Sequence, residues 1–179
     1  MKAEILETKR LILKPLSLVH GTQNYVDWLN DEDVYRYLEG NGNYTLEMLQ
    51  DYLTGVVRND IYFWAIHIKD NDVHIGNIKI DPINVRHKYA EYGLMIGDKS
   101  EWSKGYAKEA TIAIIDYCFN RLKIRKIALG VVADNSPAVK LYENLSFVRE
   151  GIYKNHGLYK EKYCDVIRMA IFNPLFSYD

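Results

Sequence analysis

Residues 102–107 read Trp-Ser-Lys-Gly-Tyr-Ala and lie between a short apolar run and a long run of apolar residues at helical spacing. A strand therefore leads into a loop that opens directly onto a helix. The start of a helix presents unpaired backbone N–H groups and the positive end of the helix dipole, so this position suits a phosphate group. Gly105 can adopt backbone angles that other residues avoid, and it lets a ligand approach the backbone closely. We interpret the loop as a candidate anion-binding site.

The same loop could also be a plain strand-to-helix turn, because one glycine is weak evidence for a ligand. It lacks both the Gly-Lys-Ser/Thr of a P-loop and the spaced glycine triplet of a dinucleotide fingerprint. A second junction strengthens the ligand interpretation. Residues 134–138 read Asp-Asn-Ser-Pro-Ala at the end of a predicted strand, and Tyr142 follows on the next predicted helix.

The cysteines and histidines do not suggest a reactive centre. Cys118 lies in a helical apolar pattern and Cys164 in a strand-like one, and we interpret both as buried structural thiols without an evident partnering base. His74, at the start of a strand, could face an acceptor but fits a structural histidine better. His87 and His156 are predicted to be surface loop residues. No Cys/His spacing typical of a metal site occurs, so no metal is predicted.

Composition and charge favour one ordinary globular domain over 1–179. The 179 residues are enough to bury about 70% of the surface of the unfolded chain. The formal charge of −1 argues against nucleic acid as a partner. Residues 1–9 do not resemble a leader, and no apolar run approaches the roughly 20 residues of a membrane span. We expect a soluble, cytoplasmic protein with no membrane partner.

The apolar pattern predicts the elements that must position these residues. Helical spacing predicts two short helices within 19–38, broken near 30–31, a helix over 46–57 capped by Thr45, and helices over 107–122 and 136–145. Strands are predicted at 11–15, 61–68, 73–80, 90–96, 127–132, 147–153 and 163–171, with a hairpin turn at 69–72 and loops at 41–43 and 154–162. This order predicts an α+β domain with a mixed, mostly antiparallel seven-stranded sheet and about four helices on both faces.

Five segments together resemble the GNAT superfamily of acetyl-CoA-dependent N-acetyltransferases: 8–16, 74–78, 90–96, 102–110 and 135–147. The resemblance covers nearly the whole chain, and it is closest to the branch that contains the ribosomal-protein N-terminal acetyltransferases. Two residues depart from the usual pattern. Trp102 replaces the Gln or Arg that usually begins the superfamily's loop, and Ser146 stands where a glycine often precedes Phe147.

The resemblance implies acetyl-CoA as co-substrate and direct acetyl transfer to a primary amine. It places the pyrophosphate on the N–H groups of the loop and the helix start, and the pantetheine along the preceding strand. It also implies a backbone N–H near Met95 that polarises the thioester carbonyl, and it gives Asn135 the role of holding the pantetheine arm. The donor-binding residues implied in this way are Leu94, Met95, Ile96, Trp102, Ser103, Lys104, Gly105, Tyr106, Ala107 and Asn135.

The resemblance also implies two catalytic residues. Tyr142 matches the position of the usual acid, and a phenol with a pKa near 10 can protonate the departing thiolate without being ionised at rest. The competing interpretation is a core aromatic on an amphipathic helix. Glu91 matches the position at which a carboxylate takes a proton from the amine, often through water, although a solvated strand glutamate is the alternative. Asp165 either binds a cationic amine or pairs with a neighbouring base.

In this superfamily the acceptor is selected by the early helices and the last hairpin, here 28–52 and 153–163. Their tyrosines, asparagines and aspartates suit a sugar or a nucleotide, and segments 28–38 and 74–80 look like acetyltransferases of bacterial surface-polysaccharide synthesis. We therefore expect a small-molecule amine acceptor, an amino group on a nucleotide-linked sugar. A protein N-terminal amine comes next. A polyamine is less favoured, because cations are interspersed with the acidic residues: Arg36, Lys154, Lys160 and Lys162.

Two further hypotheses remain open. The chain could be an acyl-CoA-binding module that has lost turnover, although the presence of Tyr142 and Glu91 argues against this. A homodimer through exposed strand edges or the tail at 172–179 is plausible by analogy alone.

Overall fold

The computed structural model describes residues 3–40, 42–159 and 161–177. Parts of the predicted loops at 41–43 and 154–162, and the last two residues of the tail, lie outside the described residues. The strands are β1 (Leu6–Glu7), β2 (Leu11–Pro15), β3 (Tyr62–Ile68), β4 (His74–Asn84), β5 (Tyr89–Ile96), β6 (Lys126–Val132), β7 (Val148–Tyr159) and β8 (Lys162–Phe172). The helices are α1 (Gln23–Asn30), α2 (Glu32–Tyr35), α3 (Leu46–Arg58), α4 (Tyr106–Asn120) and α5 (Ser136–Asn144), with short 3-10 turns η1 (Leu18–His20) and η2 (Lys99–Glu101).

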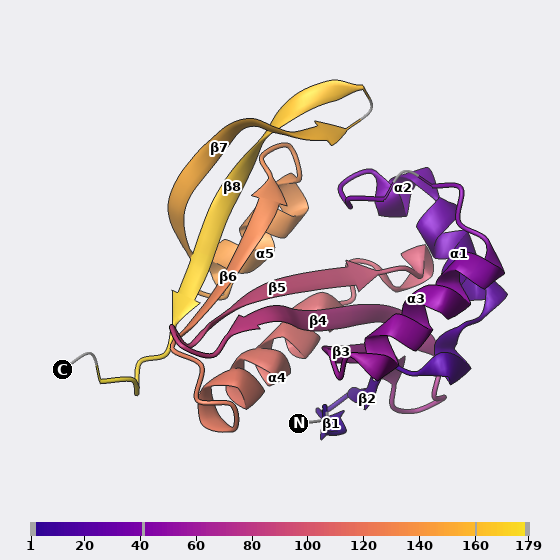
Figure 1. Ribbon diagram of the computed structural model, residues 1–179, viewed down its shortest axis with the longest axis horizontal. Helices are drawn as coiled ribbons and strands as arrows, with labels where there is room; N and C mark the ends of the chain where they lie inside the picture. Colours follow the sequence, from indigo (N-terminus) through magenta and orange to yellow (C-terminus); the bar gives the residue numbers. More distant parts are fainter. Residues whose placement is uncertain (1–2, 41, 160, 178–179) are drawn as a thin grey trace. The chain divides into compact units, whose positions relative to one another are not determined.

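Within the described residues, eight strands are hydrogen-bonded in the order β1-β2-β3-β4-β5-β6-β8-β7 (Figure 1). The β5–β6 pair is parallel, whereas the β1–β2, β2–β3, β3–β4, β6–β8 and β7–β8 pairs are antiparallel. The predicted mixed sheet is thus confirmed, but the predicted numbers of strands and helices were too small. The missed strand, β1, has two residues, which is too short for apolar alternation to be recognised.

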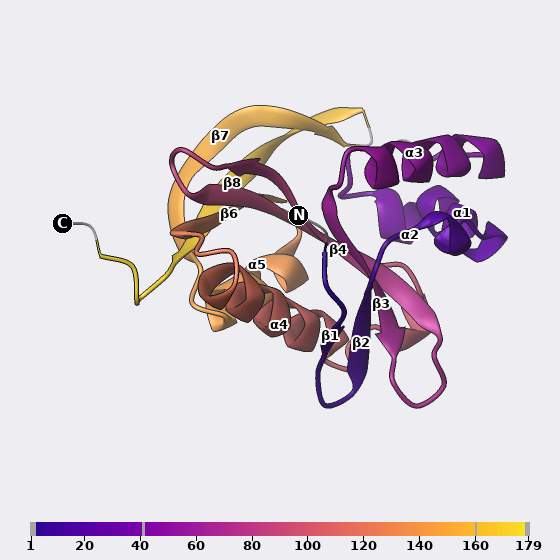
Figure 2. The same cartoon turned by 60° about the horizontal axis from the view of Figure 1, so that its bottom comes forward.

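The chain forms two compact units, one of Met1–Asp81 with Gly93–Ala113 and one of Pro82–Tyr92 with Ile114–Asp179. In the first unit, α1 and α3 lie on one side of β2 and β3 (Figure 2). Thr22, Asp31 and Thr45 accept hydrogen bonds from backbone N–H groups at the starts of α1, α2 and α3. The predicted break near 30–31 and the predicted cap at Thr45 are therefore confirmed, and both follow from short polar side chains that satisfy the first turn of a helix.

Trp28 belongs to the core of the first unit and is only 6% exposed. A Cβ at Gly97, just after β5, would collide with the Trp28 ring. The absence of a side chain at Gly97 thus lets the indole pack against the backbone at the end of β5. The segment 28–52, which the resemblance assigns to acceptor selection, thus begins with a side chain that is buried in the core.

The second unit contains the long hairpin of β7 and β8, which Figure 1 shows as two curved strands. The sequence predicted two shorter strands and a loop at 154–162, but β7 continues to Tyr159 and β8 begins at Lys162. His156 consequently lies on a strand rather than in a loop. Nearly every residue of β7 is exposed, so this edge strand has no buried face to produce the alternation on which the prediction depended.

Helix α5 ends in a Schellman motif, in which Phe147 N–H donates to Tyr142 O at 3.0 Å and Ser146 N–H donates to Glu143 O at 3.0 Å. Ser146 occupies the left-handed position, with φ of 66°. The two cysteines are both free thiols; Cys118 is buried as predicted, whereas Cys164 is only half-buried. No helix in the described part of the chain is long and apolar enough to cross a membrane.

Candidate active site

The loop before α4 contains two residues in the left-handed backbone region. Ser103 has φ of 61° and Gly105 has φ of 83°, and α4 begins directly afterwards at Tyr106. Left-handed residues interspersed in a turn direct successive backbone N–H groups to one side and form a concavity suited to an anion. A Cβ at Gly105 would have only Arg10 Nη2 nearby, at 3.5 Å. The backbone of the loop therefore fits the pyrophosphate chemistry expected of it.

Arg10 braces this loop from the strand side. Its Nε donates to Glu109 Oε2 at 2.7 Å, its Nη1 donates to Lys104 O at 2.9 Å, and its guanidinium lies 4.5 Å from the centre of the Tyr106 ring. Burial by itself would raise the pKa of Glu109, but hydrogen bonds from Thr8 and Arg10 outweigh it and lower that pKa. The first turn of α4 is thus tied to the chain before β2, and the loop is held in one shape.

Two of the predicted donor-binding side chains are engaged within the protein. Trp102 Nε1–H donates to Ile96 O at 2.8 Å, and Lys104 Nζ lies 2.9 Å from Glu101 Oε2. The indole therefore closes the loop back onto the end of β5. These contacts position the loop, and they leave its backbone N–H groups, rather than its side chains, as the main anion donors.

The end of β5 runs close to the start of β4. A Cβ at Gly76 would collide with the carbonyl oxygen of Met95, so glycine at this position allows the two backbones to approach. Leu94, Met95 and Ile96 are all half-buried. The carbonyl of Ile96 already accepts from Trp102, which reduces the hydrogen-bonding capacity that this strand can offer to a pantetheine arm.

In the second unit, Asn135 caps α5. Its side-chain oxygen accepts from Ala138 N–H at 3.3 Å, and Pro137 occupies the first turn, where a missing N–H is harmless. This bond explains the Asn-Ser-Pro pattern without a ligand. The bond uses the amide oxygen of Asn135 and not its amide nitrogen. Capping is therefore compatible with the role that the resemblance implies for Asn135, which is to hold the pantetheine arm.

Tyr142, also in the second unit, is 8% exposed and packs its ring against Tyr92 and Phe147, with centroid distances of 5.8 and 5.6 Å. Burial raises the pKa of Tyr142 to about 12, although a hydrogen bond with Tyr92 opposes the shift. The side chain is thus packed among aromatic rings, as the competing interpretation expects, and its hydroxyl also has a polar neighbour, so both interpretations of Tyr142 stay open. The phenol stays protonated throughout the neutral pH range.

Glu91 is joined to Arg168 rather than solvated alone. Arg168 Nη2 donates to both carboxylate oxygens of Glu91, at 2.6 and 2.8 Å, and both side chains are about a quarter exposed. The pair lines a cleft of about 460 Å³ in the second unit. Asp165 pairs with a neighbouring base, Lys154, at 2.7 Å, as one of its two interpretations predicted.

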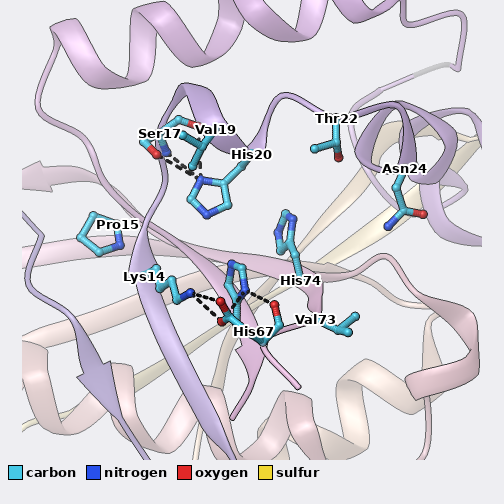
Figure 3. Close-up of a pocket in the computed structure, with 11 residues that line it drawn as sticks. Lys14, Pro15, Ser17, Val19, His20, Thr22, Asn24, His67, Val73 and His74 are labelled. Atoms are coloured by element: carbon cyan, nitrogen blue, oxygen red, sulfur yellow. Dashed lines mark hydrogen bonds and ion pairs between the residues drawn. The ribbon is translucent and has the colours of Figure 1, made fainter. Parts of the chain in front are cut away.

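The first unit has a second hollow, of about 630 Å³, lined by three histidines (Figure 3). The ring centroids of His20, His67 and His74 are 5.2 to 5.4 Å apart. His67 Nδ1 lies 2.9 Å from Asp72 O, while its Nε2 is buried without a partner. Burial, with a contribution from the other two rings, lowers the pKa of His74 to about 4. Among the described residues, no group of three or more His, Cys, Asp or Glu is arranged to hold a metal ion.

A sequence profile described as an acetyltransferase (GNAT) domain matches residues 10–148. The chain belongs to the GNAT acetyltransferase family. It is therefore an N-acetyltransferase that uses acetyl-CoA, as the sequence predicted. The co-substrate is compatible with the backbone of the loop before α4, where two left-handed residues precede the positive end of a helix.

The names of two relatives of this GNAT acetyltransferase specify spermidine as the acceptor, and the name of a third specifies none. It is 28% identical to an uncharacterized N-acetyltransferase, p20, of Bacillus licheniformis over 97% of this chain and 99% of that one. It is 36% identical to a spermidine N(1)-acetyltransferase of Vibrio cholerae over 57% of this chain and 58% of that one. A crystal structure of spermidine N-acetyltransferase from Vibrio cholerae with CoA and spermine superposes with a TM-score of 0.85 at 24% identity, covering 93% of this chain and 97% of that one.

Sequence reasoning about this GNAT acetyltransferase missed the partners of its predicted residues. The loop is contacted by Arg10, Tyr142 by Tyr92, and Glu91 by Arg168. The ring of His74 lies beside those of His20 and His67. Arg10 and Tyr92 have a sequence signal, because they lie within the matched segments 8–16 and 90–96. The others occupy strands or a short turn whose apolar pattern reveals nothing about contacts between segments far apart in the chain.

Proposed function

We propose that this enzyme transfers the acetyl group of acetyl-CoA directly to the amino group of a nucleotide-activated sugar. The observation that carries the proposal is the wall of the cleft in the second unit, where the half-exposed ring of Tyr153 lies 5.8 Å from the Arg168 guanidinium. An aromatic face stacks on a sugar or a base, and a guanidinium beside it binds phosphate oxygens. A nucleotide-linked amino sugar combines both features.

The charge distribution supports this acceptor over a polyamine. Asp31 and Asp33 share Lys99, with contacts of 2.6 and 3.2 Å, and Asp165 is paired with Lys154. These carboxylates are satisfied by cations of the chain itself, whereas a polycationic acceptor requires carboxylates that it can pair with. The spermidine acetyltransferases among the relatives make spermidine a necessary comparison in the assay.

In the proposed reaction the amine nitrogen attacks the thioester carbonyl, a C–N bond forms, and the C–S bond breaks. Tyr142, the proposed acid, donates a hydrogen bond to the sulfur as negative charge develops there, and CoA leaves as the thiolate. Because its pKa is raised to about 12, above that of an ordinary thiol near 8.5, transfer to a free thiolate is uphill, and the phenol acts mainly as a hydrogen-bond donor during bond cleavage. The amine proton leaves through water toward Glu91, for whose carboxylate oxygens Arg168 competes.

The test is release of CoA thiol with a panel of amines. The panel contains amino-sugar nucleotides, the corresponding free amino sugars, N-terminal peptides, L-amino acids and spermidine. The proposal predicts the highest kcat/KM for an amino-sugar nucleotide. Turnover with peptides alone would instead support the ribosomal-protein branch that the sequence resembles, and turnover with spermidine alone would equally overturn the sugar acceptor.

Tyr142→Phe tests the acid role with the best acceptor from the panel. We expect kcat to fall about 100-fold, the lower end of the range for general acid catalysis, with little change in acetyl-CoA affinity. Tyr62→Phe is the matched control, because Tyr62 lies on β3, outside the segments assigned to the donor and the acceptor, and the variant should leave kcat unchanged. Equal rates for wild type and Tyr142→Phe would show that Tyr142 is only a core aromatic.

A further inference from the structure

The cleft of the second unit contains more positive than negative side chains. Its lining includes the cations Arg125, Lys126 and Arg168 and the carboxylates Glu91 and Glu150. Lys126 is paired with Glu150 at 2.6 Å, and Arg168 is paired with Glu91. Each carboxylate is therefore matched by a cation of the cleft itself, and the lining includes three cationic and two anionic side chains. A hollow of this kind favours an anionic ligand over a cationic one.

Arg168 lies in the floor of this cleft between two glycines. In the sheet register it faces Gly130 on β6 and Gly151 on β7. A Cβ at Gly130 would lie 3.2 Å from Arg168 Nη1, whereas a Cβ at Gly151 would meet nothing within 4 Å. Glycine weakens a strand interior, and it often marks a place where a ligand approaches the backbone. Gly130 accommodates the guanidinium, and Gly151 leaves open space beside it.

The guanidinium is held in place with part of its donor capacity unused. Both hydrogen bonds to Glu91 come from Nη2. In the part of the chain that the structure describes, Nε and Nη1 of Arg168 donate no hydrogen bond, and neither atom is fully buried. The planar fork of arginine can bind an oxyanion through two donors while a third nitrogen stays paired. Because Glu91 already orients the group, little side-chain entropy remains to be lost on binding.

We infer that the cleft is an oxyanion subsite, in which Arg168 and the open space beside Gly151 bind a phosphate or carboxylate group carried by the acceptor. The inference rests on the proposed function in one respect, namely that the oxyanion belongs to the acceptor rather than to the donor. Arg168 is then a binding residue, which selects acceptors that bear negative charge at a distance from their amine.

The first experiment measures binding without turnover. Calorimetry follows pyrophosphate, and separately N-acetylglycine, added to the protein with saturating CoA, so that the loop before α4 is already occupied. Arg168→Gln should weaken the bound oxyanion at least about tenfold, since a hydrogen bond to a charged group contributes about 1.5–3 kcal/mol. Arg149→Gln is the matched control, because Arg149 lies on β7 but pairs with Glu143 of α5 at 2.7 Å and does not line the cleft. Its affinity should stay within about twofold of wild type, as surface charges contribute little.

A second variant keeps Arg168 and fills the open space beside Gly151. Gly151→Val adds its side chain where a Cβ meets no other atom, so it should fold and still lose oxyanion affinity. Preference for pyrophosphate assigns the subsite to a phosphate, and preference for N-acetylglycine assigns it to a carboxylate. No binding by either probe, equal losses in Arg149→Gln, or full affinity in Gly151→Val would each overturn the inference.

Steady-state kinetics separate this inference from the proposed function. With an amino-sugar nucleotide, Arg168→Gln should raise the KM of the acceptor at least about tenfold, while the KM of acetyl-CoA stays constant. A raised KM for acetyl-CoA alone would assign the cleft to the donor and overturn the inference. Oxyanion binding without acetylation of any amino sugar would leave the subsite standing and overturn the proposed acceptor.

Discussion

The histidine pocket of the first unit and the cleft of the second unit place polar side chains below the surface in opposite ways. In the pocket, burial lowers the pKa of His20 and His74, so these imidazoles become neutral instead of pairing with a counter-ion. In the cleft, Glu91 and Arg168 are joined by two hydrogen bonds as a carboxylate and a guanidinium. Burying a neutral ring costs little desolvation free energy, but such a ring attracts no charged ligand. A paired arginine keeps hydrogen-bond donors that can still bind a charged ligand. The cleft is therefore better suited to recognise a charged substrate.

The largest expected effect comes from acidifying the histidine pocket. The pKa of His74 is about 4 in the folded protein and 6.5 in an unfolded chain, so the unfolded state binds more protons below pH 6.5. Stability is then fully present above pH 6.5 and is lost as the pH falls toward 4, by on the order of 3 kcal/mol. The neighbouring rings of His20 and His67 lower the pKa of His74 in the same direction as burial. Urea unfolding between pH 7 and 4 measures the slope.

Carboxylates also titrate between pH 7 and 4, so a variant is needed to isolate the contribution of His74 to the pH dependence of stability. His74→Gln should flatten the pH dependence, and His156→Gln, an exposed histidine on β7, should not. Identical slopes for wild type and His74→Gln would show that the pocket does not depend on a neutral ring, and the contrast with the cleft would disappear.

The next effect concerns the ion pair. Glu91→Leu leaves Arg168 without its carboxylate in a partly desolvated site, and we expect the free energy of unfolding to fall by about 2 kcal/mol, less than for a fully buried pair. Glu91→Leu with Arg168→Leu should recover most of this loss, because no uncompensated charge remains. Denaturant unfolding of the two single variants and the double variant measures the coupling; purely additive losses would contradict an ionic pair.

Gly105→Val tests a third way of handling charge, in which an anion is bound by backbone rather than by side chains. A β-branched residue at φ of 83° is strained and covers the N–H groups of the loop, so acetyl-CoA affinity should fall about tenfold or more, a loss of at least 1.4 kcal/mol. Calorimetry measures it, with Gly55→Val on α3 as a control, where a Cβ meets nothing within 4 Å. Unchanged acetyl-CoA affinity would contradict the placement of the pyrophosphate.

The smallest effect should be a gain. Ser146→Gly relieves a non-glycine residue at φ of 66° in the Schellman motif after α5, and we expect about 0.5–1 kcal/mol of stabilisation. The gain arises from backbone conformation, so it should not vary with pH or salt, unlike the effects at the pocket and the cleft. Thermal unfolding at two pH values checks this; a pH-dependent gain would point to an electrostatic cause instead.

Local features were predicted well wherever a residue acts on its own neighbours. Thr45 as a cap, the break near residue 31 and the glycine loop before a helix all follow from backbone hydrogen bonding within a few residues. The hairpin of β7 and β8 was predicted too short, because an exposed edge strand has no apolar alternation. Trp28 was placed in the acceptor-selecting region by the resemblance to the superfamily, although α1 turns that side chain into the core.

The sequence by itself determined the family, the acetyl-CoA co-substrate and the loop that fits its pyrophosphate, since these depend on short motifs whose chemistry is local. Only the tertiary structure decided which residues contact each site residue. It places Arg10 beside the loop, Tyr92 beside Tyr142, Arg168 on Glu91, and three histidines in one pocket. Charge pairing and burial depend on segments far apart in the chain that meet only after folding, and the ionisation and binding capacity of a side chain depend on them.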